Sequence, residues 1–116
     1  MDHAFAIRIF SALAHDGRLS VFRTLVSVFP EALRVAEITE ITGIKGSTLS
    51  AHLSALSDAG LLQARRDGTS IFYSLSQTGV SGFVDFLLAD CCQGRPELCA
   101  PKDTLPSNAK ADLNAS

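Results

Sequence analysis

The sequence predicts a mainly α-helical domain that carries one small β-hairpin. Most of the 116 residues fall into runs whose apolar residues lie three or four positions apart, the period of an amphipathic helix. One stretch, residues 61–75, changes to alternation around Asp67-Gly68, a dipeptide typical of a type I′ hairpin turn. An apolar fraction of 47% supports a small core, and apolar helices left half covered predict a homodimer.

Two amphipathic helices open the chain. Residues 4–14 carry apolar side chains at helical spacing, and Asp16-Gly17 interrupts the run. We expect Asp16 to cap a second helix, which ends at Phe29-Pro30. Residues 30–32 then form a turn or a short helical restart.

The middle of the chain predicts two helices joined by a tight turn. Residues 35–41 form a short helix that ends at Thr42-Gly43, and residues 47–59 form a longer helix whose leucines share one face. Whether Lys45 or Ser47 begins the longer helix stays open. Two helices joined by a glycine-containing turn indicate a helix-turn-helix, in which the second helix enters the major groove of DNA.

The hairpin and one more helix complete the pattern. Residues 77–92 return to the helical period, and Gly94 and Pro96 end that helix. The order of elements is that of a winged helix-turn-helix with an additional helix at each end. We expect residues 1–92 to form the DNA-binding and dimerisation domain, and residues 93–116 to form a cysteine-containing loop and a flexible tail.

Small and polar side chains are expected on the outer face of the second helix, where they would meet base edges and phosphates. Lys45, just before this helix, is placed for a phosphate, and Arg65 and Arg66 sit near the hairpin tip. The candidate DNA-binding residues are Lys45, Ser47, Thr48, Ser50, Ala51, His52, Arg65 and Arg66. Each feature alone is also common on a solvated surface, but their combined order indicates a DNA-binding protein.

Composition bounds the remaining classes of function. The net charge of −2 permits a local basic patch and excludes a strongly basic coat. No run approaches the roughly 20 apolar residues of a membrane span, and no secretory signal is visible, so we expect a cytoplasmic protein. We find no nucleophile–base set, phosphate loop or organic cofactor motif, which argues against an enzyme.

All three cysteines lie within nine residues, at Cys91, Cys92 and Cys99. Such a cluster in a reducing compartment more often binds metal or senses oxidants than closes disulfides. Three thiolates favour a three-coordinate soft ion, so the proposed ligands suit As(III) or Sb(III) as inducer. Asp90 or water would complete a zinc or cadmium site, while a disulfide from Cys99 would make a redox sensor. A further alternative is that Cys91 or Cys92 is apolar filler in the dimer interface, which is the favoured role for a lone cysteine but not for three so close together.

The segment from Ile9 to Val26, the short helix, and the run TGIKGSTLSAHLSALSDAGLLQARRDGTSIFYSLS together resemble the ArsR/SmtB family of metalloregulatory repressors. The resemblance covers about residues 5–90. It implies a homodimer formed mostly by the first and last helices, and an operator of imperfect two-fold symmetry near the promoter of a detoxification operon. It also implies that residues 47–52, apart from Leu49, face the groove and that Arg65 and Arg66 belong to the wing.

The sequence departs from two inducer sites of that family. The short helix, residues 35–39, lacks the cysteine pair of many members, and no histidine follows His52 to form the zinc site of others. The pair Cys91-Cys92 followed by Cys99 resembles the arsenic-responsive branch. The resemblance therefore implies a repressor of an arsenic-resistance operon, with persulfide or Cd/Zn sensing as the alternative.

Overall fold

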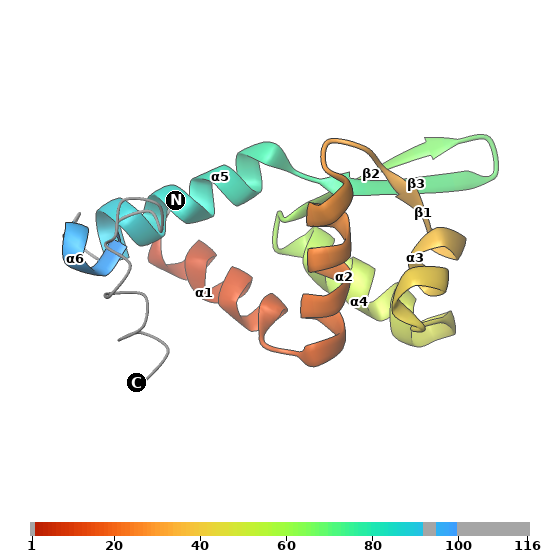
Figure 1. Ribbon diagram of the computed structural model, residues 1–116, viewed down its shortest axis with the longest axis horizontal. Helices are drawn as coiled ribbons and strands as arrows, with labels where there is room; N and C mark the ends of the chain where they lie inside the picture. Colours follow the sequence, from red (N-terminus) through yellow and green to blue (C-terminus); the bar gives the residue numbers. More distant parts are fainter. Residues whose placement is uncertain (1, 92–94, 100–116) are drawn as a thin grey trace, which may run out of the picture. The chain divides into compact units, whose positions relative to one another are not determined.

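The computed structural model describes residues 2–91 and 95–99, in two compact units, Met1–Phe83 and Val84–Ser116. Apart from the short strand β1 and the short helix α6, which were not predicted, the ribbon in Figure 1 follows the predicted order of elements along the chain. Its elements are α1 His3–Leu13, α2 Asp16–Val28, β1 Leu33–Arg34, α3 Val35–Thr42, α4 Gly46–Asp58, β2 Leu62–Asp67, β3 Ser70–Leu75, α5 Gln77–Asp85, the π-helix η1 Phe86–Cys91 and α6 Pro96–Cys99. The prediction of a mainly helical winged helix-turn-helix is confirmed.

Side chains next to the helix ends fix where α1 and α2 begin. The Asp2 carboxylate accepts a 2.8 Å hydrogen bond from the Phe5 N–H at the start of α1. At the start of α2, Nδ1 of His15 accepts the Gly17 N–H at 3.0 Å. The prediction that Asp16 caps α2 was therefore wrong: Asp16 is the first helical residue, and the cap is His15.

The helix-turn-helix consists of α3 and α4. α3 ends at Thr42, and its C-cap residue Gly43 has a φ of 78°, in the left-handed region that glycine adopts without a Cβ penalty. The chain then turns through Ile44 to Lys45, which is the N-cap residue of α4. The sequence left open whether Lys45 or Ser47 begins α4, the recognition helix of the motif. Its first residue is Gly46.

The wing is the antiparallel hairpin β2–β3, with Leu62 opposite Leu75 and Asp67 opposite Ser70. The strands extend to the last of these pairs, so the two central turn residues are Gly68 and Thr69, one position later than predicted. The sequence also failed to predict β1, which pairs with the other side of β3 to give the order β1-β3-β2. A two-residue strand is too short to show a period.

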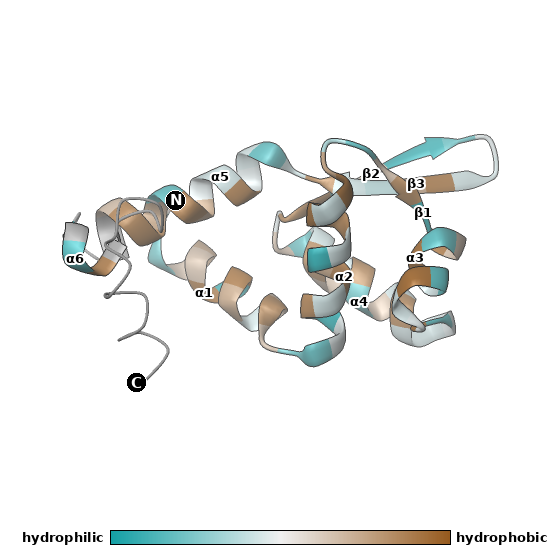
Figure 2. Ribbon diagram, viewed as in Figure 1, coloured by the Kyte–Doolittle hydropathy of each residue, from teal (hydrophilic) through white to brown (hydrophobic). Residues whose placement is uncertain are grey.

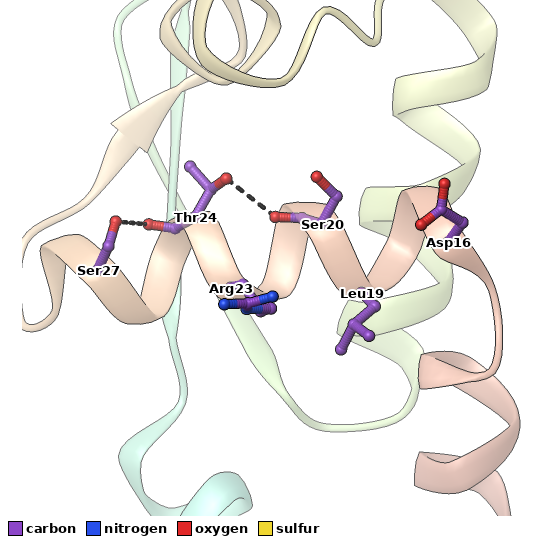
Figure 3. A pocket seen from close by; sticks show the side chains of 6 residues that line it. All are labelled: Asp16, Leu19, Ser20, Arg23, Thr24 and Ser27. Atoms are coloured by element: carbon purple, nitrogen blue, oxygen red, sulfur yellow. Dashed lines mark hydrogen bonds between the residues drawn. The ribbon is translucent and has the colours of Figure 1, made fainter. Parts of the chain in front are cut away.

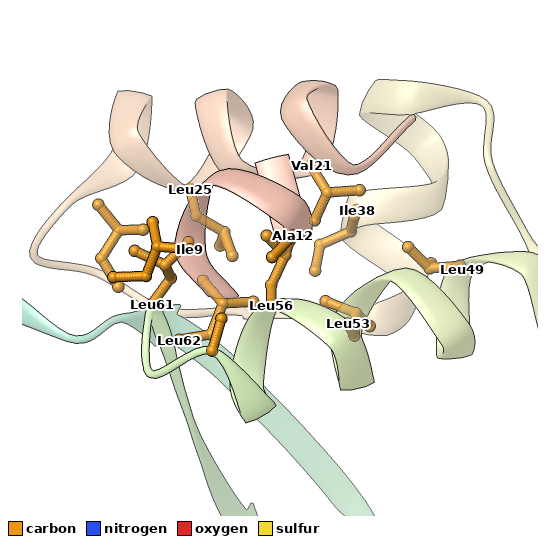
Figure 4. Close-up of a cluster of buried hydrophobic side chains, with 12 residues drawn as sticks. Ile9, Ala12, Val21, Leu25, Ile38, Leu49, Leu53, Leu56, Leu61 and Leu62 are labelled. Carbon is orange, nitrogen blue, oxygen red and sulfur yellow. The ribbon is translucent and has the colours of Figure 1, made fainter. Parts of the chain in front are cut away.

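One buried cluster joins the helices of the first unit to the base of the wing (Figure 4). Its members are Ile9, Ala12, Val21, Leu25, Ile38, Leu49, Leu53, Leu56, Ala59, Leu61, Leu62 and Leu75. Figure 2 shows hydrophobic and hydrophilic residues alternating along α1, α2 and α4, as expected for helices with one buried face. This core holds α4 by one face and leaves the opposite face exposed.

The last predicted helix begins at Gln77 as expected but changes its hydrogen-bonding pattern. α5 ends at Asp85, and the chain continues as η1 to Cys91. Among the described residues, no helix has the length and apolar character needed to cross a bilayer. The functional division at residue 92 stays a prediction.

Candidate nucleic-acid interface

The first half of α4 presents four exposed small side chains, as predicted: Ser47, Thr48, Ser50 and Ala51. Lys45, immediately before the helix, is also exposed, and its side chain makes no capping hydrogen bond. The first backbone N–H groups of α4 therefore lack a side-chain acceptor, which suits them for a phosphate oxygen. Small side chains allow the helix backbone to approach base edges closely.

His52 does not belong to this exposed face, and its predicted role as a groove-facing residue is corrected. Only 6% of its surface is exposed. Its position, three residues after Leu49 and four before Leu56, places it on the buried side of α4. The leucine spacing already contained this signal.

The buried imidazole of His52 packs against the α1–α2 junction. Its ring centroid lies 4.8 Å from that of His15, and its Nδ1 atom is buried without a hydrogen-bond partner in the described residues. A Cβ added to Gly17 would lie 2.6 Å from Nε2 of His52, so only glycine fits there without a shift. Burial lowers the pKa of His52 below the ordinary imidazole value, and positive charge on His15 and Arg18 lowers it further.

The lowered pKa of His52 predicts acid sensitivity of the fold. The unfolded chain takes up this proton near pH 6.5, whereas the folded chain resists it, so the contribution is complete above about pH 6.5 and is lost as pH falls below that value. Urea unfolding between pH 7.5 and 5 should show a shallower pH dependence for His52→Gln than for wild type. His3→Gln, which removes an exposed histidine from α1, should keep the wild-type dependence. Equal curves for wild type and His52→Gln would contradict this assignment.

The wing carries Arg65 and Arg66 on its exposed strand β2. The guanidinium carbon of Arg65 lies 5.2 Å from the ring centroid of Phe72, its partner across the hairpin. Because successive strand residues point to opposite faces, the two arginines leave the hairpin on opposite sides. The aromatic contact orients Arg65 and leaves its N–H groups able to bind phosphate.

Among the described residues, the predicted cations have no recorded ion pair. In residues 2–91 the one recorded salt bridge joins Arg34 to Glu37, so Lys45, Arg65 and Arg66 have no acidic partner within this range. Exposed cations without a recorded acidic partner are available to bind the phosphates of a polyanion, even on a protein of net charge −2.

The far end of α4 contacts both α1 and α5, which the sequence analysis missed. Arg8 of α1 donates from Nη2 to the carbonyl oxygen of Asp58 at 3.2 Å. In the following turn, Gly60 has a φ of 85°, and a Cβ on Gly79 of α5 would overlap its carbonyl oxygen. A glycine inside a predicted helix was the one available signal for this close approach.

A polar hollow on α2 is not a second candidate site. Its lining comes from this single helix (Figure 3), at Asp16, Leu19, Ser20, Arg23, Thr24 and Ser27. The Thr24 and Ser27 hydroxyls already donate to carbonyl oxygens of their own helix, at 2.9 and 2.6 Å. The hollow is therefore lined by one helix alone, and two of its hydroxyl groups are already engaged within that helix.

The predicted metalloid ligands lie at the end of the chain. The backbone of Cys91 ends η1 and that of Cys99 ends α6, while Cys92 and the thiol groups of all three cysteines lie outside the described residues. Their grouping into one site stays a prediction.

Comparison with known proteins agrees with this geometry. A family described as a helix-turn-helix domain matches residues 13–63, from the end of α1 to the start of the wing. The transcriptional activator HlyU of Vibrio cholerae is 31% identical over 92 residues, 79% of this chain and 82% of that protein. Its solved structure matches with a TM-score of 0.61 and 30% identity, covering 80% of this chain and all of that one.

Two further relatives extend the comparison. A probable mercury resistance operon repressor of Streptomyces lividans is 37% identical over 84 residues, 72% of this chain and 63% of that protein. The solution structure of Mb0332 from Mycobacterium bovis, described as a homodimeric winged helix-turn-helix and a possible ArsR-family regulator, has a TM-score of 0.60 at 30% identity. The match covers 74% of this chain and 78% of that one. The chain therefore belongs to the ArsR/SmtB family of DNA-binding transcriptional regulators, which are not enzymes.

Proposed function

We propose that this protein is a cytoplasmic, homodimeric repressor of an arsenic-resistance operon, released from its operator when As(III) or Sb(III) binds Cys91, Cys92 and Cys99. The observation that carries the metalloid assignment is the confinement of every cysteine to nine residues, 91–99. A relative named as a mercury resistance repressor supports a response to a thiophilic element.

The exposed face of α4 supports the operator-binding half of the proposal. In a two-fold dimer, two copies of α4 enter successive major grooves, about 34 Å apart along the DNA. Ser47, Thr48, Ser50 and Ala51 approach base edges, while Lys45 and the wing arginines neutralise phosphates. The homodimeric state described for Mb0332 supports this arrangement.

Ligand chemistry supports the inducer half. Arsenite is present at neutral pH as As(OH)₃. Three thiols each form one As–S bond and give up one proton, and the three hydroxyl groups leave as three waters, with no change of oxidation state. The soft thiolate donors disfavour magnesium and calcium, and zinc generally requires a fourth ligand.

The proposed release follows from where these thiols lie in the chain. Cys91 ends a π-helical segment, a local departure from α-helix that is frequent at functional sites. Tying that segment to Cys99 would pull on the helix that the family resemblance places in the dimer interface, so the two protomers would change their mutual angle. The metalloid must bind the released state more tightly than the DNA-bound state, with a coupling free energy of about 1–3 kcal/mol or more.

Fluorescence anisotropy will test the proposal with a duplex that the full-length protein selects from a random-sequence pool. Under reducing conditions, arsenite should release the wild-type protein at least tenfold more readily than it releases Cys91→Ser, Cys92→Ser or Cys99→Ser. The triple variant should bind the duplex normally and ignore arsenite. Release of the triple variant by arsenite, or no release of wild type, would reject the assignment.

Separate titrations test the alternatives on the same protein. Release by peroxide or persulfide without metalloid would identify a redox sensor, and release by Cd²⁺ or Zn²⁺ but not arsenite would identify a metal sensor. Arsenic measured per chain, together with release, should approach one atom for each chain.

A further inference from the structure

The C-terminal end of the recognition helix is held by a charged side chain from another helix. The last carbonyl groups of a helix lack partners within it, and that of Asp58 accepts a hydrogen bond from Nη2 of Arg8. The two residues are 50 positions apart in the sequence, so this bond joins α1 to the C-terminal end of α4. A cation also suits the negative end of the helix dipole.

Side-chain packing joins α1 and α4 through the buried cluster, to which Ile9 and Leu56 belong, and the Arg8 bond adds a polar contact at the C-terminal end of α4. A groove of about 400 Å³ lies beside it, lined from α1 and the start of α2 by Ile7, Arg8, Ser11, Ala12 and Arg18 and from α4 and its end by Ala55, Asp58 and Ala59. The guanidinium of Arg8 reaches the α4 carbonyl at the edge of that groove, and its carbon lies 5.8 Å from the centroid of the Phe5 ring. Arg18 is already engaged, since its Nε donates to the carbonyl oxygen of Ala12 at 2.6 Å.

This bond lies at one end of α4, so a tilt of the helix around that end displaces the DNA-facing end. Asp58 and Ser47 lie at opposite ends of α4, about 17 Å apart at a rise of ~1.5 Å per residue. A tilt of about 5° around the Asp58 end would therefore move Ser47 by roughly 1.5 Å. Hydrogen bonds to base edges do not tolerate such a shift, because they require donor–acceptor distances of about 2.7–3.2 Å. Phosphate contacts from flexible lysine and arginine side chains would adapt to it.

We infer that Arg8 is a positioning residue for the recognition helix: its bond to the Asp58 carbonyl sets the tilt of α4 and thereby the sequence-specific part of DNA binding. Arg8 itself touches no base or phosphate in this assignment. The inference depends on sequence-specific DNA binding by α4, and not on the cysteine site, so it survives if arsenite proves not to be the inducer.

The test compares Arg8→Met with Arg23→Met in the full-length protein. The two changes remove the same charge, and Arg23 is exposed on α2 with no recorded partner in the described residues. The probes are the duplex that wild type selects from a random pool and, for nonspecific binding, poly(dI-dC). Arg8→Met should lose about tenfold affinity for the selected duplex and less than twofold for poly(dI-dC). Arg23→Met should change the ratio of the two affinities by less than twofold.

The conservative variant separates positioning from other roles. Arg8→Lys, whose ammonium can donate to the same carbonyl, should recover at least half of the lost discrimination on a logarithmic scale, and it serves as the test if Arg8→Met does not fold. An unchanged ratio in Arg8→Met, or no recovery in Arg8→Lys, overturns the inference. Equal losses of affinity on both DNA probes would assign Arg8 to phosphate contact. Dissociation of the dimer in sedimentation would assign Arg8 to the subunit interface. Either result also overturns the inference. If the wild-type protein selects no DNA sequence, this inference and the operator-binding part of the proposed function both fail. If only the release by arsenite fails, the inference about Arg8 is unaffected.

Discussion

Replacing Gly79 with alanine will destabilise the fold by about 3 kcal/mol or more, at the upper end of the usual cost of overpacking. The added Cβ would overlap the carbonyl oxygen of Gly60 and lie 2.9 Å from its carbonyl carbon. Both atoms belong to the backbone of a tight turn, so neither can move aside by rotating a side chain. In an open helix the same change stabilises by up to about 1 kcal/mol, so the sign of the effect reports on the contact.

Urea unfolding followed by circular dichroism will measure this change. Ser81→Ala is the matched control, because Ser81 is exposed on the same helix and the substitution also introduces alanine. Its unfolding free energy should stay within about 0.5 kcal/mol of wild type, as is usual for surface substitutions. A Gly79→Ala protein as stable as wild type would show that α5 does not approach the turn after α4 this closely.

Placing a carboxylate on the DNA-facing side of α4 will abolish useful operator binding. Ala51 is exposed between the hydroxyl side chains of that face, so Ala51→Glu would bring a negative charge against phosphates and base acceptors. Juxtaposed like charges cost several kcal/mol, and we expect at least a ~100-fold loss of affinity, which corresponds to about 2.7 kcal/mol. Stability should change little, because glutamate is a good helix former at an exposed position.

The control for Ala51→Glu adds the same charge elsewhere. Gln77→Glu is nearly isosteric and lies at the exposed first residue of α5, where a negative charge suits the helix dipole. Anisotropy with the selected duplex should show less than a threefold effect for this variant. If Gln77→Glu weakened binding as much as Ala51→Glu, net charge rather than the face of α4 would control DNA affinity.

Local patterns in the sequence were sufficient for the order and type of most elements. Apolar spacing identifies α1 to α4, and the Asp67-Gly68 dipeptide locates the hairpin to within one residue. These features depend on interactions among near neighbours in the chain, which a period of 3.6 or 2 residues records directly. The strand β1 was missed because its two residues are strand only through their pairing with β3.

The roles of side chains were harder to predict where a residue contacts a second helix or turn. His52 was assigned to the groove from its polarity, although its spacing from Leu49 and Leu56 placed it on the buried face. Asp16 was assigned as a cap from its residue type, but His15 makes that hydrogen bond. In both cases a histidine makes a structural contact that its residue type alone does not predict.

By itself, the sequence determined the winged helix-turn-helix pattern, the exposed small side chains of the recognition helix and the confinement of all thiols to one short segment. All three can be recognised from residues that lie close together in the chain. Only the tertiary structure decided which residues hold α4 in place: the Arg8 bond to Asp58, the backbone approach of Gly79 to Gly60, and the His52 contact with His15. Those pairs lie 19 to 50 positions apart in the chain. No local period encodes such contacts, because they exist only after the core has brought the helices together.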